Sequence, residues 1–317
     1  MKRFIILTEA GREVGFGHLS RMAVLRKILT DRGVSVDLRV KLDTTTELDW
    51  DGQMIPCDDW IKNWPKNNLI IVDSYRVGLD CLAGIRAQNL KLIYMDDFGR
   101  LDPPCDLIIN ANLGTESFLY KNADESLVGS SFVILQEGIR KSQKKVNHKD
   151  RLHKILISMG GSEVQPLFDS LKDFCDKHSK FEFKILAPWL SKESNPNSKN
   201  IEFISQLSAE KLAILMLESD LVLTAAGQTT HELAYLAVPF IAFAISKDQE
   251  PKVDFLLKCG LQSKRIQIAS REFFEDLDQA ISLLTSADAR KNFGRQSLSL
   301  IDDRGAERIV DHILKLS

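Results

Sequence analysis

The sequence predicts an α/β protein made of two successive domains of similar size. Short runs of β-branched and apolar residues recur along the chain and alternate with segments of helical period. Strands that are apolar throughout are typical of a parallel sheet covered by helices on both faces. The alternation stops at a basic stretch near the middle and then starts again. The length of 317 residues also suits two domains, at roughly 150 residues each.

The first domain is placed at residues 1–145. The segment that begins at Leu19 carries apolar residues at helical spacing and is predicted as a helix after the first strand. The predicted strands are Phe4–Leu7, Val36–Val40, Leu69–Val72, Leu92–Met95 and Leu107–Asn110, with Phe132–Leu135 as a possible sixth.

The stretch Arg140–Arg151 holds six Lys or Arg residues and almost nothing apolar. It is interpreted as a solvated linker between the domains, with a nucleic-acid patch as the weaker alternative.

The second domain is placed at residues 152–317. Its predicted strands are Ile155–Met159, Phe183–Ala187, Ile201–Ile204, Leu221–Thr224, Phe240–Phe243 and Ile266–Ile268. Its predicted helices are Gln165–Lys177, Ala209–Glu218, Thr229–Ala237, Arg271–Leu284 and Ala306–Leu316. Two Rossmann-like domains of this kind are expected to face each other across a cleft and to bind ligands at the carboxyl ends of their strands.

Composition narrows the class of function. Lys and Arg number 42 and Asp and Glu 44, so the net charge is −2, which lacks the basic footprint of a nucleic-acid binder. The apolar segment Tyr235–Ile245 is too short to span a bilayer and contains a proline. The five cysteines form no C-x-x-C pair, so neither a zinc site nor a disulfide framework is indicated. We expect a soluble, cytoplasmic protein that acts on a small molecule with no metal and no cofactor.

A first glycine motif follows the first predicted strand. Gly15 and Gly17 allow a sharp turn and a close approach to a ligand. His18 then stands at or near the start of a helix, whose positive end disfavours the imidazolium, so His18 is expected to stay neutral and to be able to act as a base near pH 7. Arg21, one turn later, is expected to face the same site. The alternative is a plain turn with a capping histidine, and Ser20 stands where a dinucleotide fingerprint has its third glycine.

A second glycine motif opens the second domain. Gly160, Gly161 and Ser162 follow a predicted strand and precede a predicted helix. Adjacent glycines at such a junction can form a nest of backbone N–H groups that holds a phosphate. The alternative is an ordinary strand-to-helix turn.

A third motif follows the strand Leu221–Thr224. The small residues Ala225, Ala226 and Gly227 leave room for a ligand, and Glu232 is a candidate acceptor of hydrogen bonds from a ribose diol. Thr229 and Glu232 also have the spacing of a capping box, which is the structural alternative for this glutamate. Further along, Asp248 and Gln249 belong to a loop at the expected ligand-binding edge of the sheet.

The ordered series of motifs resembles a known family. It resembles the UDP-sugar hydrolases of the pseudaminic acid pathway and, more broadly, the MurG-type glycosyltransferases, which share the two-domain fold called GT-B. The residues that carry the resemblance are Gly15–Arg21, Asp73–Tyr75, Asp96–Asp97, Cys105–Asn110, Met159–Gly161, Gly227 with Glu232, Lys247 with Gln249, and Asp303–Arg308.

The resemblance implies a metal-independent hydrolase that releases UDP and a free 2,4-diacetamido-2,4,6-trideoxy sugar with inversion. It implies that His18 is the general base and that Tyr75 positions the water or the sugar. It also implies that Gly160, Gly161 and the helix after them bind the diphosphate and that Glu232 binds the ribose. Asp248 and Gln249 would touch the sugar or the phosphates. The residues expected to act in catalysis are His18, Tyr75 and Asp248, and those expected to bind substrate are Gly15, Gly17, Arg21, Gly160, Gly161, Ser162, Gly227, Gln228, Thr229, Glu232 and Gln249.

This chain departs from the family pattern on the sugar side. The family has an arginine two positions before an aspartate at the end of the first strand, where this chain has Leu7 and Glu9. The family's asparagine in the lysine–glutamine loop is Asp248 here. The exact sugar therefore stays open.

Three other functions are considered. A transferase on the same scaffold would use an acceptor hydroxyl in place of water, and turnover without any acceptor would exclude it. A protein that binds a nucleotide sugar without turning it over is the second. A dinucleotide oxidoreductase is the third, and the incomplete glycine fingerprint disfavours it. A monomer is expected, because the ligand cleft of this fold lies within one chain.

Overall fold

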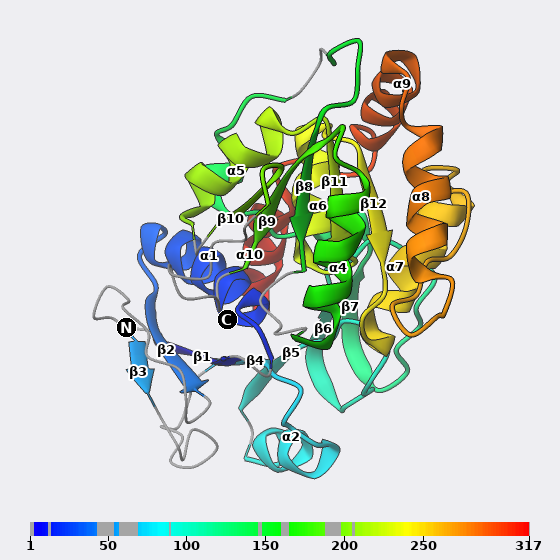
Figure 1. The fold of residues 1–317 in the computed structure, drawn as a ribbon. Coiled ribbons are helices and arrows are strands. Elements are labelled where there is room, and N and C mark those ends of the chain that lie inside the picture. The colour runs from blue at the N-terminus through cyan, green and yellow to red at the C-terminus, as the bar shows by residue number, and fades with distance from the viewer. Residues whose placement is uncertain are drawn as a thin grey trace. The chain divides into compact units, whose positions relative to one another are not determined.

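The computed structural model describes residues 3–11, 14–42, 54–56, 69–88, 90–144, 148–159, 165–187, 198–204 and 207–316. The chain divides into two compact units (Figure 1), the first formed by Met1–Gln136 with Asp303–Ser317 and the second by Glu137–Asp302. Each unit contains its own parallel sheet with helices, which confirms the predicted fold class.

The first unit holds a seven-stranded sheet. Its strands are β1 (Arg3–Ala10), β2 (Ser35–Leu42), β3 (Met54–Pro56), β4 (Leu69–Asp73), β5 (Lys91–Met95), β6 (Cys105–Asn110) and β7 (Ala123–Val128). Their order is β3-β2-β1-β4-β5-β6-β7, and every neighbouring pair is parallel. The helices are α1 (Gly17–Asp31), α2 (Leu79–Arg86), the 3-10 turn η1 (Ser130–Phe132) and α10 (Gly305–Leu316).

The strands of the first unit are apolar throughout because both faces of the sheet are covered. Phe4 and Ile6 of β1 belong to the core shared with α1 and α10. Ile5 and Leu7 of the same strand belong to the core shared with α2. Successive side chains of a strand point to opposite faces, so one uninterrupted apolar run supplies both cores.

The last helix packs on the first unit, although the sequence placed it in the second domain. α10 buries Ala306, Ile309, Val310 and Ile313 in the core that also contains α1. This apolar stripe recurs every three to four residues, so the helix must lie on an apolar surface. Position along the chain does not reveal which of two similar sheets offers that surface. The chain therefore enters the second unit after Gln136 and leaves it at Asp302.

Gly305, the first residue of α10, makes a close approach that leaves no space for a side chain. An added Cβ would lie 2.1 Å from the carbonyl oxygen of Val133 and 2.7 Å from the carbonyl carbon of Phe132. These are backbone atoms, so the helix itself must shift. Gly305→Ala should therefore lower the stability of the first unit by about 1–3 kcal/mol, seen as a lower midpoint of thermal unfolding.

Gly84 in α2 provides the matched control for that substitution. An added Cβ there meets nothing within 4 Å. Gly84→Ala should raise stability by roughly 0.5–1 kcal/mol, since alanine is the better helix former. Equal unfolding midpoints for the two variants would contradict the close packing of α10.

The second unit holds a five-stranded parallel sheet in the order β10-β9-β8-β11-β12. The strands are β8 (Lys154–Ser158), β9 (Glu182–Leu186), β10 (Ile201–Ile204), β11 (Leu221–Ala225) and β12 (Phe240–Phe243). The helices are α3 (Glu137–Arg140), α4 (Gln165–Lys177), α5 (Ala209–Glu218), α6 (Gln228–Leu236), the 3-10 turn η2 (Lys247–Gln249), α7 (Glu250–Lys258), α8 (Phe273–Leu283) and α9 (Ala287–Ser297). α4 and α8 pack on the same core of this sheet.

Two predicted strands are wrong. Phe132–Leu135 is not a strand, because Phe132 and Val133 donate their backbone N–H groups locally to Gly129 and Ser130. The edge strand next to β6 is β7, whose exposed acidic residues hide it from an apolar pattern. Ile266–Ile268 forms a single bridge, between Gln267 and Ala244, rather than a strand.

The predicted helices Gln165–Lys177 and Ala209–Glu218 match α4 and α5 at both ends. The other predicted helices of the second domain differ from the observed ones by one or two residues at their ends. None of the helices in the described ranges is long and apolar enough to cross a membrane.

Candidate functional site

Polar side chains gather at the carboxyl edge of the first sheet. Glu9 lies near the end of β1, Asp73 ends β4, Asp97 follows β5 and Asn112 follows β6. These four strands are neighbours in the sheet, so their carboxyl ends meet at one edge. Glu9, Asp73 and Asn112 are at most 2% exposed. A cluster of buried polar groups at this edge is a candidate ligand site.

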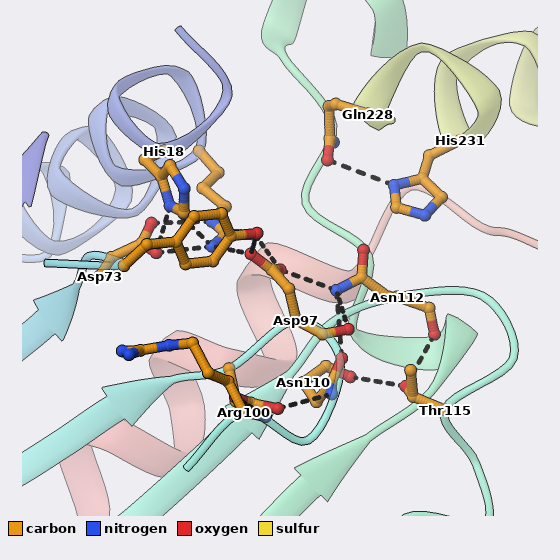
Figure 2. Close-up of polar contacts among 12 residues, drawn as sticks. His18, Asp73, Asp97, Arg100, Asn110, Asn112, Thr115, Gln228 and His231 are labelled. Carbon is orange, nitrogen blue, oxygen red and sulfur yellow. Dashed lines mark hydrogen bonds and ion pairs between the residues drawn. The ribbon is translucent and has the colours of Figure 1, made fainter. Parts of the chain in front are cut away.

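His18 lies at the start of α1, above this edge (Figure 2). The structure confirms the predicted glycine turn before His18. Gly15 has a φ of 73°, a backbone conformation that favours glycine. An added Cβ on Gly17, the first residue of α1, meets nothing within 4 Å. The Nδ1 atom of His18 lies 2.7 Å from Oδ1 of Asp73, and both side chains are buried.

Arg21, one helical turn after His18, is buried between two carboxylates. Its Nε and Nη2 donate to Asp73 at 2.7 and 2.5 Å. Its Nη1 and Nη2 donate to Asp97 at 2.5 and 2.9 Å. Only 9% of its side chain is exposed. The guanidinium therefore joins the ends of β4 and β5, and its contact with substrate stays a prediction.

Tyr75 packs against His18 and reaches the carboxylate of Asp97. Its ring meets the His18 ring edge to face, with centroids 4.5 Å apart. Its hydroxyl donates to Oδ2 of Asp97 at 2.6 Å, and its backbone N–H donates to Oε1 of Glu9 at 2.7 Å. Asn112 also donates to Asp97, at 2.8 Å. These contacts hold the Tyr75 ring beside His18 and fix the orientation of Asp97.

Opposite charges decide how these groups ionise. Burial alone would raise the pKa of Asp73 and Asp97, but the Arg21 guanidinium lowers the pKa of Asp73 and holds that of Asp97 well below its usual range. Burial alone would lower the pKa of His18, but the Asp73 carboxylate raises it above the ordinary 6.5. Both aspartates are therefore carboxylates at neutral pH.

The expectation that the helix terminus keeps His18 neutral is corrected by this finding. The position at the helix start is confirmed, but a carboxylate in direct contact outweighs the partial charge of a helix end. The pKa of His18 is raised, which makes it a stronger base. It must still lose its proton before it can accept one.

The contact with Asp73 also assigns the tautomer of His18. We place the proton of the neutral imidazole on Nδ1, where it is donated to Oδ1 of Asp73. Nη2 of Arg21, 3.1 Å from Nδ1, is then satisfied by its two carboxylate bonds. Nε2 has no hydrogen-bond partner in the part of the chain that the structure describes, so its lone pair is available. A carboxylate-oriented imidazole with a free Nε2 can take a proton from a bound nucleophile.

Another acidic residue, Asp96, has a different role. It accepts hydrogen bonds from the backbone of Gly99 and Arg100 and from the side chains of Asn110 and Tyr120. It thereby fixes the loop after β5 that carries Asp97. Asp73, Asp96 and Asp97 belong to the motifs of the sequence, but no role was predicted for them. Their shared position, at the carboxyl ends of neighbouring strands of one parallel sheet, is the signal that could have singled them out.

In the second unit, the third glycine motif, around Gly227, lies at the start of a helix as predicted. The helix start does not have the predicted capping box. Gly227 is the N-cap of α6 and has no side chain with which to cap this end. Thr229 is already the second residue of the helix, so the Thr229–Glu232 capping box is wrong. Glu232 lies one turn further in and is 2% exposed. Gln228, the first helical residue, has its Oε1 atom 3.2 Å from Nδ1 of His231 (Figure 2).

Gln249 lies next to the start of α6. Its Oε1 accepts the backbone N–H of Ile245, and its Nε2 is 3.9 Å from where a Cβ on Gly227 would stand. Asp248, in η2, is partly exposed. The structure thus brings Gly227 and Gln249 together at the carboxyl end of β11, and the ligand contacts of these residues stay predictions.

Gly160, Gly161 and Ser162 lie outside the described residues. Within the described ranges, no three His, Cys, Asp or Glu side chains are grouped so that they could hold a metal ion.

Comparisons with known proteins add the family context. No protein-family model matches the chain. The chain is 25% identical over 282 residues to an uncharacterized protein of Methanocaldococcus jannaschii, covering 81% of this chain and 58% of that protein. It is 24% identical over 280 residues to the UDP-2,4-diacetamido-2,4,6-trideoxy-beta-L-altropyranose hydrolase of Campylobacter jejuni, covering 82% of this chain and 98% of that protein.

Among solved structures, MurG of Acinetobacter baumannii matches with a TM-score of 0.65 and 15% identity, covering 99% of this chain and 100% of that chain. The chain has the GT-B fold. Its resemblance to the Campylobacter hydrolase confirms the likeness predicted from the motif order. Within the GT-B fold, the His18 cluster occupies the carboxyl edge of one sheet, and the start of α6 follows a strand at the carboxyl edge of the other.

Proposed function

We propose that this chain is an inverting hydrolase of a UDP-linked 2,4-diacetamido-trideoxy sugar, with His18 as the general base. The observation that carries the proposal is the pair formed by His18 and Asp73, 2.7 Å apart at the carboxyl edge of the first sheet. The hydrolase of Campylobacter jejuni, to which the chain is similar over most of its length, acts on such a substrate by its name.

The proposed step is a single displacement at the anomeric carbon. Nε2 of His18 takes a proton from water while the water oxygen bonds to the anomeric carbon. The bond from that carbon to the phosphate oxygen breaks, and its electron pair leaves with UDP. His18 then returns its proton to solvent. The free sugar and UDP are the products, and attack from the face opposite the leaving group inverts the anomeric centre.

The nucleotide is proposed to bind to the second unit. Backbone N–H groups at the start of α6 point out of the helix and attract an anion. Gln249 adds a side-chain amide beside them. Glu232 would accept hydrogen bonds from the ribose, and Gly160, Gly161 and Ser162 would contact the diphosphate, as the resemblance implies.

Glu232→Ala should weaken UDP binding about tenfold or more, because a hydrogen bond to a charged group contributes roughly 1.5–3 kcal/mol. Isothermal titration calorimetry with UDP measures this directly. Asp220→Asn is the matched control, because Asp220 is also buried but lies before β11 and accepts the backbone N–H groups of His153 and Lys154. Unchanged UDP affinity in Glu232→Ala would remove the ribose role.

The defining experiment measures UDP release from a panel of UDP-amino sugars in buffer alone, with the sugar product identified by mass spectrometry. Free sugar from a 2,4-diacetamido donor supports the hydrolase. The GT-B fold favours one other function, a transferase that uses an acceptor hydroxyl. UDP release that requires an added acceptor would replace the hydrolase with the transferase.

A further inference from the structure

Arg21 is placed to control the base rather than to hold the substrate. Four hydrogen bonds to Asp73 and Asp97 use most of the N–H groups of its guanidinium. The side chain is 9% exposed, and Nη2 lies 3.1 Å from Nδ1 of His18. A residue in this position acts on His18 both through the shared carboxylate and directly through its charge.

The charges around His18 determine how readily its imidazole loses a proton. The charged and titratable groups that face His18 in the described part of the chain are Arg21 from α1, Asp73 at the end of β4, Asp97 after β5 and the Tyr75 phenol. With His18 protonated, two cations meet two carboxylates. With His18 neutral, one negative charge remains. The two carboxylates favour the protonated imidazole, and Arg21 opposes them.

We propose that Arg21 is a positioning residue that shares Asp73 with His18 and offsets the two carboxylates, so that the imidazole gives up its proton near neutral pH. The effect on turnover rests on the proposed function, whereas the effect on His18 does not. Without Arg21, His18 would face two uncompensated carboxylates and would keep its proton to higher pH. Without Asp97, only the Asp73 carboxylate would remain to offset the positive charge of Arg21. His18 would then lose its proton at lower pH.

The two substitutions therefore have opposite signs. Arg21→Gln should move the titration midpoint of His18 upward, and Asp97→Asn should move it downward. A role limited to packing predicts that both variants move the midpoint downward, toward the ordinary value of 6.5, because both loosen the contact with Asp73. Arg21→Lys keeps the charge but loses the two-carboxylate fork. Its midpoint should stay near that of the wild type while its turnover falls.

The measurement is a pH titration of the imidazole by NMR in the free protein labelled on histidine. The His18 signal is identified by its loss in His18→Asn. Arg86→Gln is the control, because Arg86 also pairs with two aspartates, Asp106 and Asp124, in contacts that do not include His18. Arg86→Gln should leave the His18 midpoint unchanged. Because no substrate is present, this result does not depend on which sugar the enzyme takes.

Arg21→Gln leaves the two carboxylates buried without the guanidinium and can fail to fold. A double variant that keeps the charges balanced therefore completes the test. Arg21→Gln with Asp97→Asn removes one charge of each sign. Its midpoint should lie nearer to the wild type than that of either single variant.

Turnover provides the second readout. Arg21→Gln should lose activity at neutral pH and recover it at higher pH, because the acidic limb of its pH–rate profile moves upward with His18. A raised KM with an unchanged pH profile would instead show that Arg21 binds the substrate. That outcome, or downward titration shifts in both single variants, would overturn the proposal. Absence of turnover with every donor, together with the opposite titration shifts, would count against the hydrolase alone.

Discussion

His18→Asn should lower kcat by about 10²–10⁴-fold, the usual effect of removing a general base. Water would still reach the anomeric carbon, but no group would accept its proton in the transition state. UDP should bind as tightly as to the wild type, because the nucleotide is proposed to bind to the second unit. Steady-state UDP release measures kcat, and calorimetry with UDP measures the affinity for UDP.

His312→Asn is the matched control for that substitution. His312, on α10 in the same unit, also pairs with a carboxylate, its Nδ1 lying 2.8 Å from Oε1 of Glu125. It lies outside the His18 cluster, so its loss should leave kcat near that of the wild type. Near-full activity in His18→Asn would show that another group is the base.

The pH dependence of the wild type follows from the same pair. His18 accepts a proton only when it is neutral, so kcat/KM should fall as the pH drops below its pKa. That pKa lies above 6.5 because the Asp73 carboxylate outweighs burial. The acidic limb of the profile should therefore lie at higher pH than the pKa of an exposed histidine.

The fold could be predicted from the sequence because buried parallel strands leave a strong local pattern. Runs such as Ile5–Leu7 and Leu107–Ile109 are apolar on both faces, and the structure buries all of these side chains. The exceptions have physical reasons. β7 is an edge strand with exposed acidic residues, so it has no such run. α10 has a clear apolar stripe, but the stripe does not indicate which sheet it covers.

The candidate site could be predicted only in part. The glycine turn marks His18 because turns of this kind need a positive φ, which the structure has at Gly15. Nothing local reveals that Asp73, 55 residues away, touches its ring. Nor does the sequence show that Arg21 lies between two carboxylates rather than facing solvent. These pairings depend on the strand order β1-β4-β5, which the sequence does not specify.

Asp73→Asn should also lower kcat, by up to about 10⁴-fold, without removing the base itself. An asparagine can no longer favour the proton on Nδ1 or stabilise the imidazolium that forms during the reaction. The pKa of His18 should fall, because the carboxylate is what raises it. The acidic limb of the pH–rate profile should thus move to lower pH while the plateau falls. Loss of the base alone would abolish that limb instead of moving it.

Stability must be separated from catalysis in this variant, because Arg21 loses one of its two carboxylates. Removing one partner of a buried ion pair can destabilise by roughly 3–5 kcal/mol. Asp106→Asn is the matched control. Asp106 is also 2% exposed or less, and it pairs with Arg86 and with Lys91, whose Nζ lies 2.7 Å away, at the start of β6. Both variants should unfold at lower temperature, but only Asp73→Asn should move the pH–rate profile. If Asp106→Asn moved that profile equally, the effect would belong to the stability of the first unit, and Asp73 would have no particular link to the base.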